Sequence, residues 1–145
     1  QLGLGEFTID DFNILGKLGA GKFGSVYKAS EKSKGTEVAL KIVKKKLLDQ
    51  YDFYSQMKRE LELQYRLGVH PNIVKMYGCF YDDNYVYAVL EYLPEGNLYQ
   101  RLKKVKIFTD EDTRNIIQQI VSALWHCQLR NVIHRDIKPE NILVK

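Results

Sequence analysis

The spacing of apolar residues changes once along this chain, at Pro94-Glu95-Gly96, and this change constrains the fold most strongly. Before it, apolar and polar residues mostly alternate, as in β-strands, and the period lengthens to that of a helix only over residues 54–67. After it, a capping box at Thr109–Asp112 precedes a wide apolar stripe at helical spacing that runs to about Leu129. The pattern predicts an α+β protein with a small β-rich part, a hinge over residues 91–96 and the first helices of a second part.

Composition argues against several kinds of partner. The chain of 145 residues has a formal net charge of +4, and the run Lys44-Lys45-Lys46 is interpreted as a solvated face rather than a nucleic-acid site. No apolar run approaches the length of a membrane span. Cys79 and Cys127 lie far apart without metal-ligand spacing, which indicates reduced thiols in an intracellular protein. We therefore expect neither nucleic-acid nor membrane partners.

A glycine-rich segment with Gly19, Gly21 and Gly24 has the pattern G-x-G-x-x-G. Alone this signal is weak, because glycines also mark tight turns. A dinucleotide-binding fold would place a helix after the third glycine, whereas residues 25–29 have the pattern of a strand. The sequence thus places the glycines at the tip of a β-hairpin, where backbone N–H groups can approach phosphates because no Cβ intervenes.

Lys41 interrupts the apolar strand segment Val-Ala-Leu-Lys-Ile-Val over residues 38–43. On a strand, Ala39 and Lys41 point to the same face. A lysine in such an apolar strand needs an anion to offset its desolvation. Two interpretations follow: Lys41 binds phosphates and a carboxylate, or the strand lies at a sheet edge and the lysine reaches water.

The helix predicted over residues 54–67 offers two carboxylates, Glu60 and Glu62, as partners for Lys41. Glu60 falls on the same stripe as Met57, at helical steps of three or four residues. Glu62 falls on the opposite side of the helix and is expected to face water. An acid on an inward stripe is unusual unless it is paired, so we predict an ion pair between Lys41 and Glu60.

The segment His-Arg-Asp-Ile-Lys-Pro-Glu-Asn over residues 134–141 is the most specific signal in the chain. Asp136 can accept the proton of an attacking hydroxyl group, and Lys138 can neutralise charge on a transferring phosphoryl group. Asn141 offers an amide oxygen to Mg²⁺, which prefers oxygen ligands. His134 is expected to have a structural role. The combination predicts phosphoryl transfer.

Together these segments resemble the protein kinase family, in which a Gly-rich loop, a lysine strand, a helix glutamate and a His-Arg-Asp loop occur in this order. Among kinases the chain is most similar to Aurora-type serine/threonine kinases, through the motifs FTIDDF, GKFGSVY, HPNIVKMYG, VLEYLPEGNLY and VIHRDIKPENILV. The resemblance implies a two-lobed fold. Residues 1–11 would be an N-terminal extension, residues 12–93 a complete β-rich N-lobe, and residues 94–145 the start of a helical C-lobe truncated after the catalytic loop.

The resemblance also implies ATP and Mg²⁺ as cofactors. The catalytic residues would be Asp136, Lys138, Lys41 and Glu60, and Asn141 would be the metal ligand. The family pattern assigns ATP binding to Leu18, Gly19, Gly21, Lys22, Gly24, Val26, Ala39, Lys41, Leu90, Glu91, Leu93, Glu140, Asn141 and Leu143.

Some positions carry finer expectations from the resemblance. Leu90 corresponds to the gatekeeper, and Glu91 and Leu93 would present backbone groups to the adenine. The chain departs from the Aurora pattern at Ala20 and at Gly68-Val69, which makes the approach to His70 one residue longer. It departs again at Trp125-His126 and Gln128, shortly before the catalytic loop.

The implied function is that of an ATP-dependent serine/threonine protein kinase, which transfers the γ-phosphoryl group of ATP to protein hydroxyls. Lys138 favours serine or threonine over tyrosine in this family. The implied partners are protein substrates and a spindle or centromere activating partner, with a location in cytoplasm or nucleus, at the spindle or centrosome. No Asp-Phe-Gly and no activation loop follow Val144 in the printed sequence, so we expect this stretch alone to phosphorylate poorly. A catalytically inactive, pseudokinase-like fragment that binds nucleotide or docks a partner remains the alternative.

Overall fold

The computed structural model describes residues 7–21, 24–50 and 53–145. The chain divides into two compact units. The first unit comprises Gln1–Gly68 and Val74–Tyr92, and the second comprises Val69–Ile73 and Leu93–Lys145. The short segment 69–73 therefore belongs to the second unit, although it lies within the part of the sequence expected to form the β-rich lobe.

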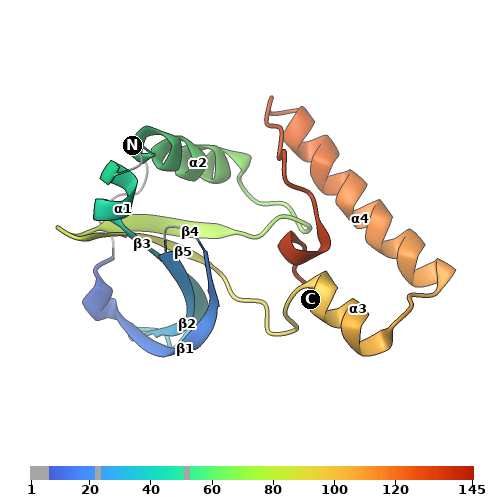
Figure 1. Cartoon of the computed structure of the whole chain (residues 1–145), viewed down its shortest axis with the longest axis horizontal. Helices are drawn as coiled ribbons and strands as arrows, with labels where there is room; N and C mark the ends of the chain where they lie inside the picture. The colour runs from blue at the N-terminus through green and yellow to red at the C-terminus, as the bar shows by residue number, and fades with distance from the viewer. Residues whose placement is uncertain (1–6, 22–23, 51–52) are drawn as a thin grey trace. The chain divides into compact units, whose positions relative to one another are not determined.

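The first unit is built on a five-stranded antiparallel sheet with the strand order β1-β2-β3-β5-β4 (Figure 1). The expectation of a β-rich unit is confirmed. The central strand is β3, so the interpretation of Lys41 as a lysine on an edge strand is wrong. The strands are β1 (Phe12–Ala20), β2 (Gly24–Glu31), β3 (Glu37–Lys44), β4 (Met76–Tyr81) and β5 (Tyr85–Glu91).

The alternation of apolar residues explains why β3 can occupy the centre of the sheet. Val38 and Leu40 are buried on one face, and Val43 is buried on the other. A strand with both faces covered needs apolar residues at nearly every position, which is the pattern of residues 38–43. The core on the first face consists of Phe12, Ala29, Val38, Leu40, Phe80, Tyr87 and Val89.

Helices α1 (Lys45–Gln50) and α2 (Tyr54–Leu67) complete the first unit, together with the 3₁₀ turn η1 (Ile9–Asp11) (Figure 1). The predicted helix over residues 54–67 is confirmed at both ends. Its Met57 packs with Val43 and Leu48 in a second core cluster. Helix α1 was not predicted, because its lysine-rich start was interpreted as a solvated face; its Leu48 is buried.

The second unit contains α3 (Leu98–Val105), α4 (Asp110–Gln128) and the 3₁₀ turn η2 (Pro139–Asn141). The predicted capping box of α4 is confirmed. The Asp112 N–H donates to Thr109 Oγ1 at 3.1 Å, and the Thr109 N–H donates to Asp112 Oδ2 at 3.3 Å. A second capping box, of Asn97 with Gln100, begins α3. The side chains of these caps satisfy N–H groups that have no partner within the helix.

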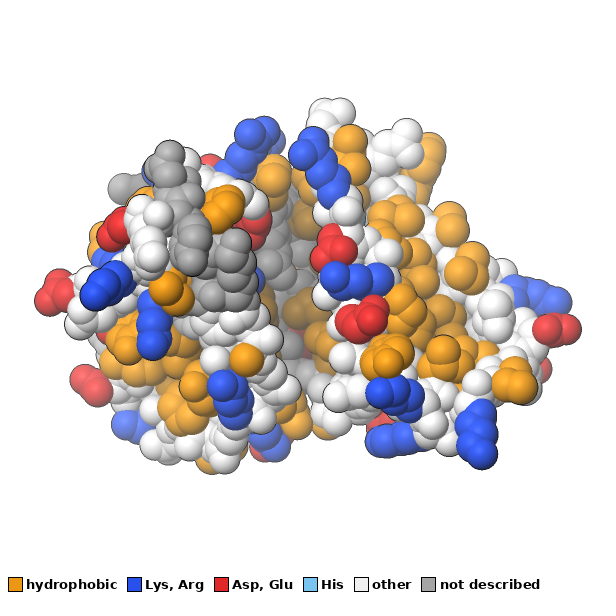
Figure 2. All heavy atoms as spheres, viewed as in Figure 1, with side chains coloured by type: hydrophobic (Ala, Val, Ile, Leu, Met, Phe, Trp, Pro, Cys, Tyr) orange, Lys and Arg blue, Asp and Glu red, His pale blue; other side chains and the backbone are white. Residues whose placement is uncertain are grey.

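Helix α4 carries an exposed hydrophobic area. Ile117, Val121 and Trp125 are each more than half exposed. Figure 2 shows hydrophobic side chains gathered on this part of the second unit. Among the residues that the structure describes, no helix is both long and apolar enough to cross a membrane.

Candidate active site

The register of the sheet brings predicted ATP-binding residues onto one face of the first unit. Val26 on β2 lies directly opposite Lys41 on β3, and Leu90 on β5 lies directly opposite Ala39 on β3. Residues directly opposite each other in an antiparallel pair share a face of the sheet. A cation and three apolar side chains therefore adjoin one another on three neighbouring strands, an arrangement suited to phosphates beside a flat apolar ring.

The Gly-rich segment connects the antiparallel strands β1 and β2, as predicted: Gly19 lies on β1, Gly24 begins β2, and the Gly21 N–H donates to Gly24 O at 2.8 Å. The space around its glycines differs. A Cβ on Gly24 would overlap the carbonyl oxygen of Ile42, so strand packing requires this glycine. A Cβ on Gly19 would meet no atom within 4 Å, and one on Gly21 only an ordinary contact, which leaves room for a ligand to approach. Lys22, also assigned to ATP, lies outside the described residues.

Lys41 is half-buried and makes no ion pair with any carboxylate among the described residues. The exposure expected of the two α2 carboxylates is wrong: Glu60 is exposed, and Glu62 is partly buried. Met57, Leu61 and Leu67 are the core-facing residues of this helix. The Oε1 atom of Glu60 accepts a hydrogen bond from Gln56 Nε2 at 3.0 Å. The pairing of Lys41 with Glu60 stays a prediction.

Glu91, the last residue of β5, is held by Lys75 through two hydrogen bonds. The Glu91 N–H donates to Lys75 O at 2.9 Å, and Glu91 Oε2 accepts from the Lys75 N–H at 3.3 Å. Because the N–H is engaged, a contact between Glu91 and an adenine would have to use its carbonyl group. Leu93, the other predicted backbone contact, is the first residue of the long segment of the second unit.

The remaining residues assigned to ATP are largely exposed. Leu18 lies at a register irregularity of β1 and is 48% exposed. Leu143 is 42% exposed, and Glu140 lies in the exposed turn η2. Their roles toward a nucleotide stay predictions.

The catalytic segment is anchored at both ends by the backbone. At its start, the Val132 N–H donates to the carbonyl of the buried Cys127 at 2.9 Å. After it, residues 142–144 run beside residues 96–98 and are joined to them by two backbone hydrogen bonds of 2.7 and 2.9 Å. The loop between these anchors holds every catalytic residue predicted in the second unit.

Within the loop, Asp136 is the centre of a set of polar contacts. Lys138 Nζ lies 3.2 Å from Asp136 Oδ1, and Asn141 Nδ2 donates to the backbone carbonyl and to Oδ2 of Asp136. The Asp136 N–H donates to His134 Nδ1 at 3.2 Å, which agrees with the structural role expected for His134. Arg135 has a φ of 68°, a left-handed conformation that costs a non-glycine residue about 1–2 kcal/mol. The structure thus brings Asp136, Lys138 and Asn141 together.

The contacts of Asp136 favour its charged form. The hydrogen bond from Lys138, followed by that from Asn141, holds the pKa of the Asp136 carboxyl group below its usual range. The carboxylate is therefore ionised at neutral pH. Its side chain is also 62% exposed, so an incoming hydroxyl group can reach it.

Asn141 fits the role of a magnesium ligand by its chemistry. Both of its hydrogen bonds to Asp136 use Nδ2, which leaves Oδ1 as the acceptor for a cation. Amide and carboxylate oxygens are ligands that Mg²⁺ accepts, and this ion commonly completes its coordination with phosphate oxygens and water.

The comparisons with known proteins agree with this geometry. The sequence profile of the family described as "Protein kinase domain" matches residues 12–145. The chain belongs to the protein kinase family. The antiparallel sheet with its central lysine and the Asp136 loop are thus parts of a kinase domain.

The curated relatives of this kinase domain include Aurora kinases. It is 46% identical to Aurora kinase B of Mus musculus over 138 aligned residues. This alignment covers 95% of this chain and 40% of the mouse protein. It is also 46% identical to the serine/threonine-protein kinase Aurora-1 of Arabidopsis thaliana, over 96% of the chain and 47% of the relative. The Aurora/IPL1-related protein kinase 2 of Caenorhabditis elegans is also 46% identical, and the alignment covers 97% of this chain and 46% of that relative. The chain spans less than half the length of these relatives.

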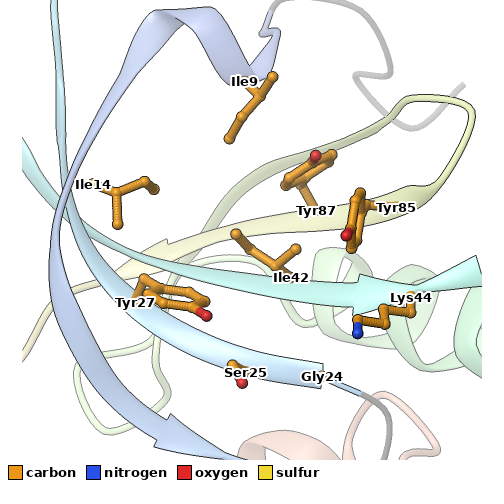
Figure 3. Close-up of a pocket in the computed structure, with 9 residues that line it drawn as sticks. All are labelled: Ile9, Ile14, Gly24, Ser25, Tyr27, Ile42, Lys44, Tyr85 and Tyr87. Carbon is orange, nitrogen blue, oxygen red and sulfur yellow. The ribbon is translucent and has the colours of Figure 1, made fainter.

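A hollow of about 350 Å³ in the first unit lies on the opposite face of the sheet from Lys41 (Figure 3). Its lining includes Ile42 and Lys44, which alternate with Lys41 along β3 and therefore point to the other face. Three tyrosines, Tyr27, Tyr85 and Tyr87, complete much of its wall. This hollow is separate from the face predicted to hold ATP.

Sequence reasoning assigned no role to His70 and His126, which the structure places in contact within the second unit. The signal available was the departure from the Aurora pattern at Trp125-His126, shortly before the catalytic loop.

Proposed function

We propose that the protein containing this kinase domain transfers the γ-phosphoryl group of ATP to serine or threonine hydroxyls of protein substrates. The observation that carries this proposal is the ionised, exposed carboxylate of Asp136 between Lys138 and Asn141. An acid in this state can orient a hydroxyl group and accept its proton. The similarity to Aurora-type serine/threonine kinases supports the choice of substrate hydroxyl.

The reaction follows from these groups. The hydroxyl oxygen of the substrate forms a bond to the γ-phosphorus, and the bond from this phosphorus to the oxygen shared with the β-phosphate breaks. The electron pair of that bond leaves with ADP, and the hydroxyl proton passes to the Asp136 carboxylate. Lys138 lies beside Asp136 and neutralises charge on the transferring group.

The nucleotide would be held by groups of the first unit. Lys41 is a cation without an ion-pair partner among the described residues, and it adjoins the apolar side chains of Val26 and Ala39. It binds the α and β phosphates, while the backbone near Gly19 and Gly21 covers them. Asn141 would hold Mg²⁺ in part, and the ion would supply positive charge that neutralises phosphate groups.

The similarity to Aurora kinases supports further proposals about the whole protein. Its substrates are proteins, and an activating partner at the spindle or centromere belongs to the same proposal. Its site of action would be inside the cell, in the cytoplasm or nucleus.

The test is Asp136→Asn in the full-length protein, with Asp83→Asn as the control. Asp83 is an exposed aspartate in the turn between β4 and β5. Asp136→Asn should lower the rate of phosphoryl transfer by at least ~100-fold, because the proton acceptor is lost, and should leave ATP affinity nearly unchanged. Asp83→Asn should change neither quantity.

The same experiment separates the two functions considered. If Asp136→Asn retains near-normal turnover, another group accepts the proton and the mechanism is wrong. If the unaltered full-length protein binds ATP but shows no transfer to any protein substrate, it is the inactive nucleotide-binding alternative.

A further inference from the structure

The second unit contains a contact between two histidines that the proposed chemistry does not use. His70 lies in segment 69–73, which connects α2 to β4, and His126 lies in the last turn of α4. The centroids of their rings are 4.6 Å apart. A further hydrogen bond, from Asn72 Nδ2 to Gln119 Oε1 at 3.0 Å, also joins the segment to α4.

The hydrogen bonds of His70 require a neutral ring. Its Nδ1 accepts the backbone N–H of Asn72 at 3.1 Å, and a backbone N–H can only donate. Nδ1 therefore carries no proton, and the ring proton sits on Nε2. Nε2 lies 3.3 Å from Ser122 Oγ on α4, to which it can donate. A proton on Nδ1 would eliminate the bond from Asn72.

His126 is constrained in the same way by Arg130. Arg130 Nη1 lies 3.2 Å from His126 Nδ1 and 3.4 Å from the His126 carbonyl oxygen. A guanidinium group only donates, so His126 Nδ1 acts as an acceptor.

The charges around His70 oppose its protonation. Burial, the neighbouring His126 and the charge of Arg130 lower the pKa of His70, in that order of importance. His126, on α4, and Arg130, just after this helix, are the titratable and charged groups that act on His70 in the described part of the chain, and neither is an acid.

We propose that the contact of segment 69–73 with α4 is an acid-sensitive clip, formed by His70, His126, Ser122 and Arg130. With neutral rings, each Nδ1 accepts a hydrogen bond and the segment is held on α4. With the His70 ring charged, its Nδ1 can no longer accept the Asn72 N–H and a new positive charge lies near that of Arg130, so the segment separates from α4.

The clip acts on the connection that follows α2. This helix ends at Leu67 and β4 begins at Met76, so opening the clip frees the chain between two elements of the first unit. Because α2 carries Glu60, a less constrained connection after this helix would affect how readily Glu60 pairs with Lys41, as predicted from the sequence. The clip itself rests on the contacts of the second unit and holds whether or not the protein transfers phosphate.

The direction of the pH effect follows from the lowered pKa of His70. The closed clip is fully favoured above the pKa of a free histidine, about 6.5, because neither state then binds the proton. As the pH falls from there to the lower pKa of the closed state, the open state binds protons preferentially. The opening equilibrium then rises by up to about tenfold per pH unit and levels off below the lower value.

Amide hydrogen exchange combined with histidine NMR on the full-length protein tests this inference. The Asn72 amide, which donates to His70, should lose protection as the pH falls below about 6.5 and should do so in step with the titration of His70. Amides in the middle of α4 should keep their protection, because only the clip opens. Exchange rates are corrected at each pH for the rate of an unstructured amide.

Two variants distinguish an effect of charge on His70 from the simple loss of a hydrogen bond between segment 69–73 and α4. His126→Gln keeps an acceptor for Arg130 and removes a group that lowers the pKa of His70, so the pH-dependent loss at Asn72 should be smaller and His70 should titrate at a higher pH. Ser122→Ala removes a hydrogen bond without changing any charge, so protection at Asn72 should fall equally at every pH.

Three results would overturn the clip. The first is constant protection at Asn72 while His70 titrates. The second is an undiminished pH-dependent loss in His126→Gln. The third is a simultaneous loss of protection throughout α4, which would indicate global unfolding instead.

Discussion

One nitrogen atom of Asn141, Nδ2, donates hydrogen bonds to both the backbone carbonyl of Asp136, at 2.9 Å, and its carboxylate, at 2.8 Å. A single amide thus fixes the main chain and the side chain of the same residue. Lys138 contacts the other carboxylate oxygen at 3.2 Å, so both oxygens of Asp136 have partners. The orientation of this carboxylate is therefore set by residues of its own loop, without a ligand.

Replacing Asn141 should raise the pKa of Asp136. Asn141→Ala removes both hydrogen bonds to Asp136, and Asn141→Asp adds a like charge, so the second change should raise the pKa further. The titration of the Asp136 carboxyl carbon by ¹³C NMR measures both effects. An unchanged pKa in Asn141→Asp would mean that the side chains separate in solution.

The pH dependence of phosphoryl transfer should reflect the lowered pKa of Asp136. Its interactions with Lys138 and Asn141 are present above the usual pKa of an aspartate, near 3.9, and are lost as the pH falls through the lower folded value. Any loss of rate in the full-length protein between about pH 5 and 7 should therefore come from another group. Lys138→Met should raise the pKa of Asp136; an acid limb that moves in step with this change would contradict the assignment.

Gly24 and Gly19 should respond differently to a methyl group. Gly24→Ala places its Cβ against the carbonyl oxygen of Ile42 and should lower the free energy of unfolding by about 1–3 kcal/mol. Gly19→Ala meets open space and should change it by less than about 0.5 kcal/mol. Urea denaturation of the full-length protein and its two variants checks the difference. Equal losses would show that the turn, rather than the packing of Gly24, limits stability.

The hydroxyl group of Tyr87 should stabilise the turn between β4 and β5. It donates to Asp82 Oδ2 at 2.6 Å, while Oδ1 of the same carboxylate accepts the N–H groups of Asn84 and Tyr85. Tyr87→Phe should cost about 1 kcal/mol in the free energy of unfolding, since Asp82 is exposed and water can replace the bond. Tyr85→Phe is the matched control, because the Tyr85 hydroxyl group makes no hydrogen bond within the described ranges. A larger loss in the control would contradict this account.

Much of the fold could be predicted because its signals are local. The period of residues 54–67 predicted α2 to the residue, and the Thr109 capping box located the start of α4. Helix α1 is short and begins in a lysine run, so it has little periodicity to detect. Helix α3 was not predicted, although the box of Asn97 with Gln100 is a local signal for its start.

The site was less predictable where it depends on neighbours distant in sequence. The apolar period of α2 does not show which residues beside the apolar stripe contact the sheet. Glu60 was therefore expected to be less exposed than Glu62, and the structure shows the reverse. The contact of His70 with His126 depends on how segment 69–73 lies on α4, for which no local pattern exists. The grouping of Asp136, Lys138 and Asn141, in contrast, needs only one short loop, and the motif contains all of it.

The anchors of the catalytic segment affect how this sequence can evolve. The bonds that join residues 142–144 to residues 96–98, and Val132 to Cys127, run between backbone groups. Most substitutions at these positions leave such bonds intact, because every residue except proline keeps its N–H group. Substitutions of the side chains at the ends of the loop should therefore have little effect on its position. Side chains between the anchors can change one at a time during evolution, and the backbone hydrogen bonds that position the loop are kept.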